Sequence, residues 1–164
     1  MKLSSLVIVI LVFFLNHRSL IADDHNPAIS AEITVYLYII KVEATIKTCG
    51  RFDPENTSLY GKVYAKYHDE ISGIVTRIGF LVGQDARSKG IDKETLLDSM
   101  EHRVNIVTQE VERTAERDST GFINLCHNMP KAAADKSGPF KPLVQRFPQE
   151  MNIIQRPEDM EKLP

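Results

Sequence analysis

Residues 53–90 read DPENTSLYGKVYAKYHDEISGIVTRIGFLVGQDARSKG, and their apolar side chains recur every three or four positions. The apolar stripe consists of Tyr60, Tyr64, Tyr67, Ile71, Ile74, Val75, Ile78, Leu81 and Val82. This spacing is that of one face of an α-helix. Asp53 suits the N-terminal cap, Pro54 suits the first helical position, and Gly90 suits the end of a helix. The sequence therefore predicts one long amphipathic helix here.

Four glycines interrupt this pattern, at Gly61, Gly73, Gly79 and Gly83. Each costs about 1 kcal/mol relative to Ala inside a helix. Such residues allow a bend or the close approach of another helix. We interpret the Gly79–Gly83 spacing as a small-residue packing face.

A second helix is predicted before this one, from about Pro27 to Cys49. Two apolar stripes lie side by side in it, one through Ile33 and Ile40 and the other through Ile39 and Ile46. So broad an apolar face is typical of a helix packed on more than one side. The β-branched and aromatic run 33–40 also fits a strand. We favour the helix, because the apolar period lasts four turns.

A third helix is predicted from Asp92 to Pro130, with a kink or short break at 118–121, where Ser, Thr and Gly cluster. Its stripe is Leu96, Leu97, Met100, Val104, Val107, Val111, Ala115, Phe122, Cys126 and Met129. Three long helices joined by short links predict an all-α, up-down-up bundle over residues 23–130. Residues 131–164 contain several prolines, and we expect an irregular C-terminal tail packed over the bundle.

The N-terminus has the pattern of a secretory signal peptide. Lys2 precedes the apolar run Leu3–Leu15, and Ala22 precedes two acidic residues. We therefore expect residues 1–22 to be a signal peptide, cleaved after Ala22, and the protein to be periplasmic or extracellular. The apolar run is shorter than the roughly 20 residues that a spanning helix needs, so we expect no integral membrane segment after signal removal.

The charge of the chain argues weakly against nucleic acid as a partner. The formal charge is −2, and removal of Lys2 and Arg18 with the signal makes the remaining chain more acidic. Its length fits one domain with a sizeable core.

The two cysteines, Cys49 and Cys126, are predicted to form an intramolecular disulfide. In an up-down-up bundle the first and third helices are parallel, so the C-terminal ends that carry the cysteines meet. Export would provide an oxidising compartment. A redox-active pair is the alternative, although the spacing is not Cys-x-x-Cys.

The other candidate residues give weaker signals. Tyr60, Tyr64 and Tyr67 could line an aromatic face for a ligand or partner, although core packing explains the same spacing. Asp98 and His102 make at most half of a metal site, so we expect no metal and no cofactor. Asn56 begins a glycosylation sequon, Asn-Thr-Ser, which would be modified only in a eukaryotic secretory pathway.

No motif identifies a reaction, because nucleophile elbows, phosphate loops and His-Glu-x-x-His are absent from the sequence. We favour a non-catalytic binding or structural role. The partner would be an envelope or secreted protein, or a small apolar ligand, held by the tyrosine-bearing face or by the tail. The alternative is an enzyme or redox protein whose site is assembled from scattered polar residues.

Overall fold

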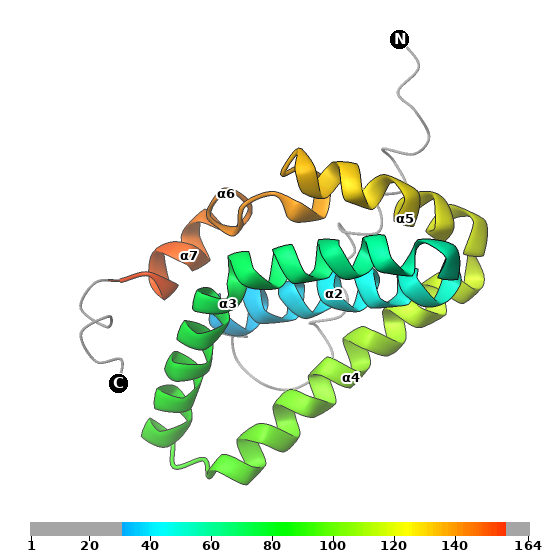
Figure 1. Ribbon diagram of the computed structural model, residues 1–164. Helices are drawn as coiled ribbons and strands as arrows, with labels where there is room; N and C mark the ends of the chain where they lie inside the picture. Colours follow the sequence, from blue (N-terminus) through cyan, green and yellow to red (C-terminus); the bar gives the residue numbers. More distant parts are fainter. Residues whose placement is uncertain (1–30, 157–164) are drawn as a thin grey trace.

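The computed structural model describes residues 31–156, and within them every regular element is helical (Figure 1). In chain order the elements are α2 (Ala31–Phe52), the 3-10 turn η2 (Pro54–Asn56), α3 (Thr57–Ser88), α4 (Lys93–Arg117), α5 (Ser119–Ala134), the 3-10 turn η3 (Gly138–Phe140), α6 (Leu143–Arg146) and α7 (Pro148–Ile154). The all-α prediction is confirmed, and the strand alternative for 33–40 is wrong. The predicted signal peptide lies outside the described residues.

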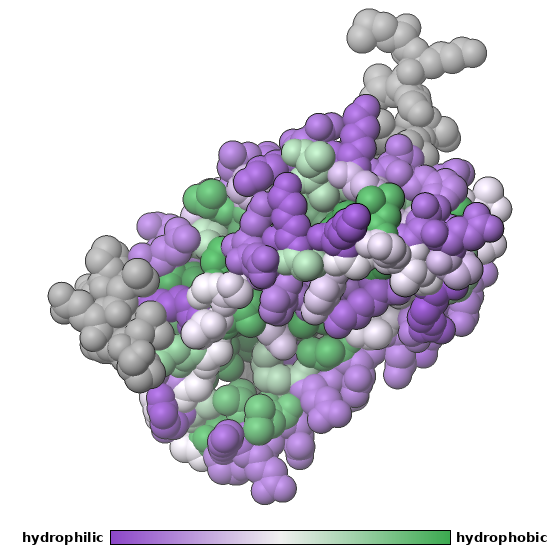
Figure 2. All heavy atoms as spheres, in the orientation of Figure 1, coloured by the Kyte–Doolittle hydropathy of each residue, from purple (hydrophilic) through white to green (hydrophobic). Residues whose placement is uncertain are grey.

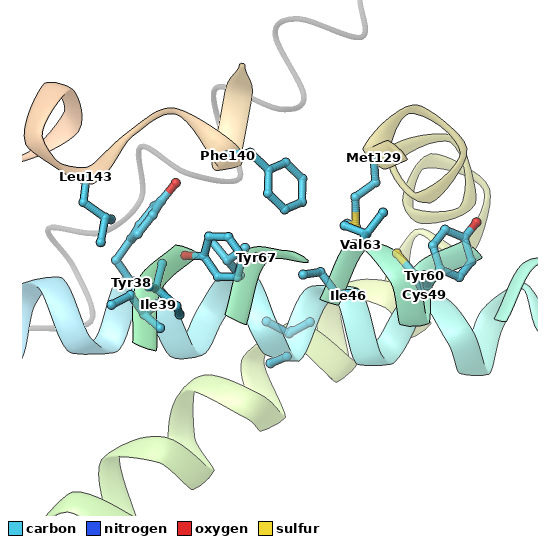
Figure 3. Packing of buried hydrophobic residues seen from close by; sticks show 14 of the residues in the cluster. Tyr38, Ile39, Ile46, Cys49, Tyr60, Val63, Tyr67, Met129, Phe140 and Leu143 are labelled. Atoms are coloured by element: carbon cyan, nitrogen blue, oxygen red, sulfur yellow. The ribbon is translucent and has the colours of Figure 1, made fainter. Parts of the chain in front are cut away.

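Helix α2 is the centre of the fold. It contacts α3, α4, α5 and α7, and its buried side chains lie on more than one face. The broad apolar face that the sequence predicted is therefore used by several neighbours at once. Figure 3 shows part of this core, where Tyr38, Ile39 and Ile46 of α2 meet Tyr67 of α3 and Phe140 of η3.

Helix α3 bends near its middle. Figure 1 shows its first half running along α2 and its second half turning away. Ser72-Gly73 lies midway along α3 in sequence, and the Thr76 hydroxyl donates to the Ser72 carbonyl at 3.0 Å. Glycine–serine pairs and such side-chain bonds to the preceding turn are both known causes of helix bending.

Gly79 and Gly83 do not form the packing face that the sequence suggested. A Cβ atom added at either position would meet nothing within 4 Å in the structure described. Within residues 31–156, neither glycine is therefore needed for the approach of another helix, and the interpretation as a packing face is wrong. Gly90, by contrast, follows the end of α3 as the sequence predicted, and its φ of +70° gives the chain a left-handed turn toward α4.

The third predicted helix is divided into two. α4 ends at Arg117, and Asp118 then caps α5, its Oδ1 accepting from the Gly121 N–H at 2.9 Å. A Cβ atom at position 121 would require the Asp118 carboxylate to shift from this capping position. The chain turns here and α5 runs back along the core (Figure 1). One third helix continuing to Pro130 is therefore wrong, and the chain breaks within the 118–121 segment, where a kink or short break was predicted.

The tail, from η3 to α7, packs on the bundle through buried side chains: Pro139, Phe140, Leu143, Met151 and Ile154. Polar contacts also hold it. The Tyr38 hydroxyl donates to the Pro139 carbonyl at 2.8 Å, and Arg77 Nε donates to the Ile154 carbonyl at 3.0 Å, at the end of α7. Cationic side chains are favoured at such helix ends.

Candidate functional site

The three candidate tyrosines do not share one open face. Tyr60 and Tyr67 are buried in the core, and Tyr64 is half-buried. The Tyr67 ring meets Phe140 edge-on, with 5.6 Å between centroids, and burial raises the pKa of its hydroxyl. Tyr60 and Tyr67 therefore serve mainly as core residues, and Tyr64 alone reaches the surface.

Tyr64 belongs to a chain of polar side chains across the α2–α3 seam. Its ring stacks on His68 at 5.7 Å, and Lys47 Nζ lies 5.0 Å from the ring centroid. His68 Nδ1 lies 3.1 Å from a carboxylate oxygen of Glu43. Each charged group here already has a neighbour of suitable chemistry, so the cluster stabilises the seam and leaves little unsatisfied for a ligand.

The sulfur atoms of Cys49 and Cys126 lie 2.06 Å apart, which is disulfide-bond distance. Cys49 lies near the C-terminal end of α2, as predicted. Cys126 lies within α5, after the turn at Asp118, and not at the end of a continuous third helix. Both residues are 0% exposed. The pair therefore joins α2 to α5 inside the core, by a route different from the predicted one.

A polar cluster lies beside the cysteines, and we call these five residues together the disulfide pole: Cys49, Asp53, Tyr60, Cys126 and His127. Asp53 Oδ2 accepts from the Tyr60 hydroxyl at 2.5 Å and lies 3.1 Å from His127 Nε2. Asn56 Nδ2 also donates to this carboxylate, at 3.0 Å. The hydrogen bond from Tyr60, followed by that from Asn56, holds the pKa of Asp53 below its ordinary value.

Sequence reasoning missed this cluster. It assigned Asp53 to capping the next helix, but the side chain makes no cap hydrogen bond to η2. His127 lies within α5, and its Nε2 faces a carboxylate 74 positions earlier in the chain. Nothing in the local sequence links the two residues. The link requires the turn at Asp118, which carried only a weak signal.

Asp98 and His102, the candidate half of a metal site, are both exposed on α4. Within residues 31–156 no group of three or more His, Cys, Asp or Glu side chains is placed to hold a metal ion. Over the same residues, no helix has the length and apolar character needed to cross a membrane.

Two ion pairs set the position of α4 on α2. Lys41, which is 3% exposed, lies with Nζ 3.7 Å from Glu110 Oε1, and Arg51 pairs with Glu112. Burial lowers the pKa of Lys41, and the nearby Glu110 carboxylate partly opposes that shift. A buried charge is tolerated only where it is paired, so Lys41 ties this crossing point of the two helices to Glu110.

A groove of about 250 Å³ lies between the same two helices. Its floor is apolar, with Ile40 and Ala44 from α2 and Val104 from α4. Charged residues of both signs form its rim: Glu43, Lys47, Arg51 and Glu112.

The most unusual feature is the apolar face of α4 beyond the groove, and we call Leu97, Met100, Val104 and Val107 the α4 stripe. Val111 and Ala115, which continue it toward the C-terminus, are 0% exposed against the core. None of the four stripe residues is buried, and Leu97 is 55% exposed. Figure 2 shows apolar side chains gathered between the outer parts of α3 and α4.

The α4 stripe was present in the sequence as a predicted core face. Among the described residues Leu97 is exposed, and Met100, Val104 and Val107 are only partly buried. The second half of α3, the turn at Gly90 and the first half of α4 diverge from α2, and we call them together the open arm (Figure 1). The arrangement can hold an apolar surface of another molecule. Comparison with protein-family models, with curated proteins and with solved structures gives no match, so the geometry alone supports the functional argument.

Proposed function

We propose that this chain is an exported, non-catalytic helical protein that binds a partner protein through the α4 stripe. One observation carries the proposal. Of the residues of α4, only Val111 and Ala115 are buried, although the apolar spacing continues through the whole helix. Apolar faces of this kind on folded proteins commonly mark interaction sites. An amphipathic helix laid in a groove is a recurrent mode of protein recognition.

The tyrosine-bearing face and the tail are less suited to this role. Tyr60 and Tyr67 are already buried, and so are the tail residues Phe140, Leu143 and Ile154. A partner would have to displace these side chains from the core before it could contact them. The α4 stripe requires no such displacement, and the adjoining groove of about 250 Å³ supplies a concave surface.

The alternative role as an enzyme or redox protein has one feature in its favour, the Asp53–His127 pair beside the cysteines. Thiol–disulfide exchange needs a sulfur atom that an attacking thiolate can reach. Both cysteines are 0% exposed, so such exchange would first require α5 to separate from α2. This favours a stabilising role for the cysteine pair and leaves binding as the preferred function.

Export is part of the proposal. The apolar run Leu3–Leu15 and the two cysteines at bonding distance are both compatible with an exported protein. N-terminal sequencing of protein recovered outside the cytoplasm should begin at Asp23. Protein that keeps Met1 in a membrane fraction would contradict this part.

Site-specific photo-crosslinking tests the binding role. Leu97 on α4 and Val144 on α6 are 55% and 53% exposed, so they form a matched pair of apolar surface positions. A crosslinker at position 97 should give a discrete adduct in the native compartment, and a crosslinker at position 144 should not. Equal adducts from both positions, or none from position 97, would contradict a partner site on α4.

A further inference from the structure

We propose that the partner presents a basic amphipathic helix to the α4 stripe. This inference rests on the proposed function and adds the chemistry of the occupant. The stripe and Val111 have the spacing of a coiled-coil seam: Leu97, Met100, Val104, Val107 and Val111 are separated by three, four, three and four residues. Such a seam is shaped to receive the apolar side chains of another helix.

The seam is continuous with the groove beside α2. Val104 belongs to both, because it forms part of the α4 stripe and of the groove floor with Ile40 and Ala44. Toward the C-terminus the seam passes under α2, where Val111 is fully buried. An added helix could therefore lie along α4 from Leu97 to the groove and end against α2, a path of roughly 20 Å at 1.5 Å per residue.

The two edges of the α4 stripe differ in charge. Glu94, Asp98 and Glu101 recur at spacings of four and three, which puts them along one side of the helix. All three are exposed, and none has an ion-pair partner among residues 31–156. The opposite edge carries Leu96 and Arg103. A helix whose facing edge carries Lys or Arg complements the acidic side.

The same charges argue against a second copy of this chain as the occupant. In an antiparallel pair of identical helices each edge faces its own counterpart, so Glu94 and Glu101 would lie opposite acidic residues. Like charges across such an interface are unfavourable. A parallel pair would bring the C-terminal halves of α4 together, and α2 already covers that part of the seam at Val111 and Ala115.

Binding of two designed peptides to the purified full chain tests the proposal. The first is a helix of about 18 residues with a leucine face and lysine on its polar edges, and the second has glutamate in place of every lysine. Fluorescence anisotropy at low salt should show the lysine peptide binding at least about tenfold more tightly. High salt should reduce that difference.

Three variants locate the interaction. Leu97→Ser should weaken the lysine peptide by about tenfold or more, and Val144→Ser, at a position of similar exposure, should not. The triple variant Glu94→Lys/Asp98→Lys/Glu101→Lys should reverse the preference between the peptides. Circular dichroism and the unfolding midpoint of each variant show whether the fold is retained.

The outcomes separate this inference from the proposed function. Equal binding of both peptides, with loss on Leu97→Ser, would overturn the basic partner and leave α4 as a docking surface. If Leu97→Ser changes the affinity of neither peptide and position 97 gives no crosslink, both the basic partner and the proposed binding function would be overturned. A dimer in sedimentation velocity that Leu97→Ser dissociates would identify a second copy as the occupant and would also overturn the inference.

Discussion

The disulfide pole and the open arm have the same three- and four-residue spacing of apolar residues, but they differ in how deeply those residues are buried. At the pole and in the adjoining turn of α2, apolar residues at three- and four-residue spacing are buried, with Cys49 at 0% and Ile46 at 1% exposure. In the open arm the same spacing leaves Leu97 at 55%. The periodicity of a helix predicts which face is apolar. Whether another element covers that face is decided elsewhere in the chain.

Helix α4 shows the difference within one element. Its last turns are held on α2 by Val111, Ala115 and the Lys41–Glu110 ion pair. Its first turns diverge, because the bend in α3 carries the α3–α4 connection away from α2 (Figure 1). Burying one large apolar side chain contributes about 1.5–3 kcal/mol. A partner that covers Leu97 and its neighbours in the α4 stripe would gain part of this free energy on binding.

The largest expected effect concerns the disulfide pole. The double variant Cys49→Ala/Cys126→Ala should lose about 4–5 kcal/mol of unfolding free energy in the chain-entropy model, because the bond closes a loop of 77 residues. Urea unfolding of the variant, and of the wild type with and without reductant, measures the loss. Wild-type protein should show no free thiol under denaturing conditions. Two reactive thiols, or equal stability of all forms, would contradict a formed bond.

A matched pair of methionines compares core packing in the two regions. Met129→Ala in α5, at 3% exposure, should cost about 2–5 kcal/mol by leaving a cavity in the core. Met100→Ala in the α4 stripe should cost less, on the order of 1 kcal/mol, because Met100 is only partly buried. Both sites are helical, so backbone propensity cancels. Similar losses in thermal or urea unfolding would mean that the stripe is covered in solution.

Local signals in the sequence predicted the helices near α2 well. The stripe from Tyr60 to Val82 became α3, and Gly90 became a left-handed turn. Asp92 caps α4 as expected, its Oδ1 accepting from the Thr95 N–H at 2.9 Å. These features depend on residues within a few positions of each other, and for that reason they can be read from the chain.

The features that the sequence did not reveal are non-local. The turn at Asp118 carried a Ser-Thr-Gly signal too weak to separate a kink from a reversal, yet it decides where Cys126 and His127 lie. The α4 stripe has the same apolar spacing as a fully buried helix face, so its partial exposure cannot be read from the sequence. Its exposure follows from the bend in α3 and from the ion pairs that fix α4 on α2.

Two glycines of the open arm provide a smaller effect of opposite sign. Gly79→Ala and Gly83→Ala should each stabilise the protein, by up to about 1 kcal/mol, because an added Cβ meets no atom of the described structure within 4 Å. Gly90→Ala is the control and should destabilise, because φ there is +70°. Thermal unfolding measures all three. A loss of stability at position 79 or 83 would indicate a neighbour packed closely against this side of α3.

The smallest effect returns to the disulfide pole and concerns pH. The pKa of Asp53 is lowered in the folded protein, chiefly by the Tyr60 hydroxyl, so its ionised form stabilises the fold. That contribution is present above the ordinary aspartate pKa and disappears as the pH falls through the lowered value. Asp53→Asn should therefore be less stable than wild type at neutral pH, and the difference should shrink toward about pH 2. Urea unfolding at both pH values measures this difference.

Asp98→Asn, on the exposed side of α4, is the control and should leave the unfolding free energy nearly unchanged at both pH values. A constant difference for Asp53→Asn would show that the variant acts through altered hydrogen bonding alone and that the carboxylate charge contributes nothing at this pole.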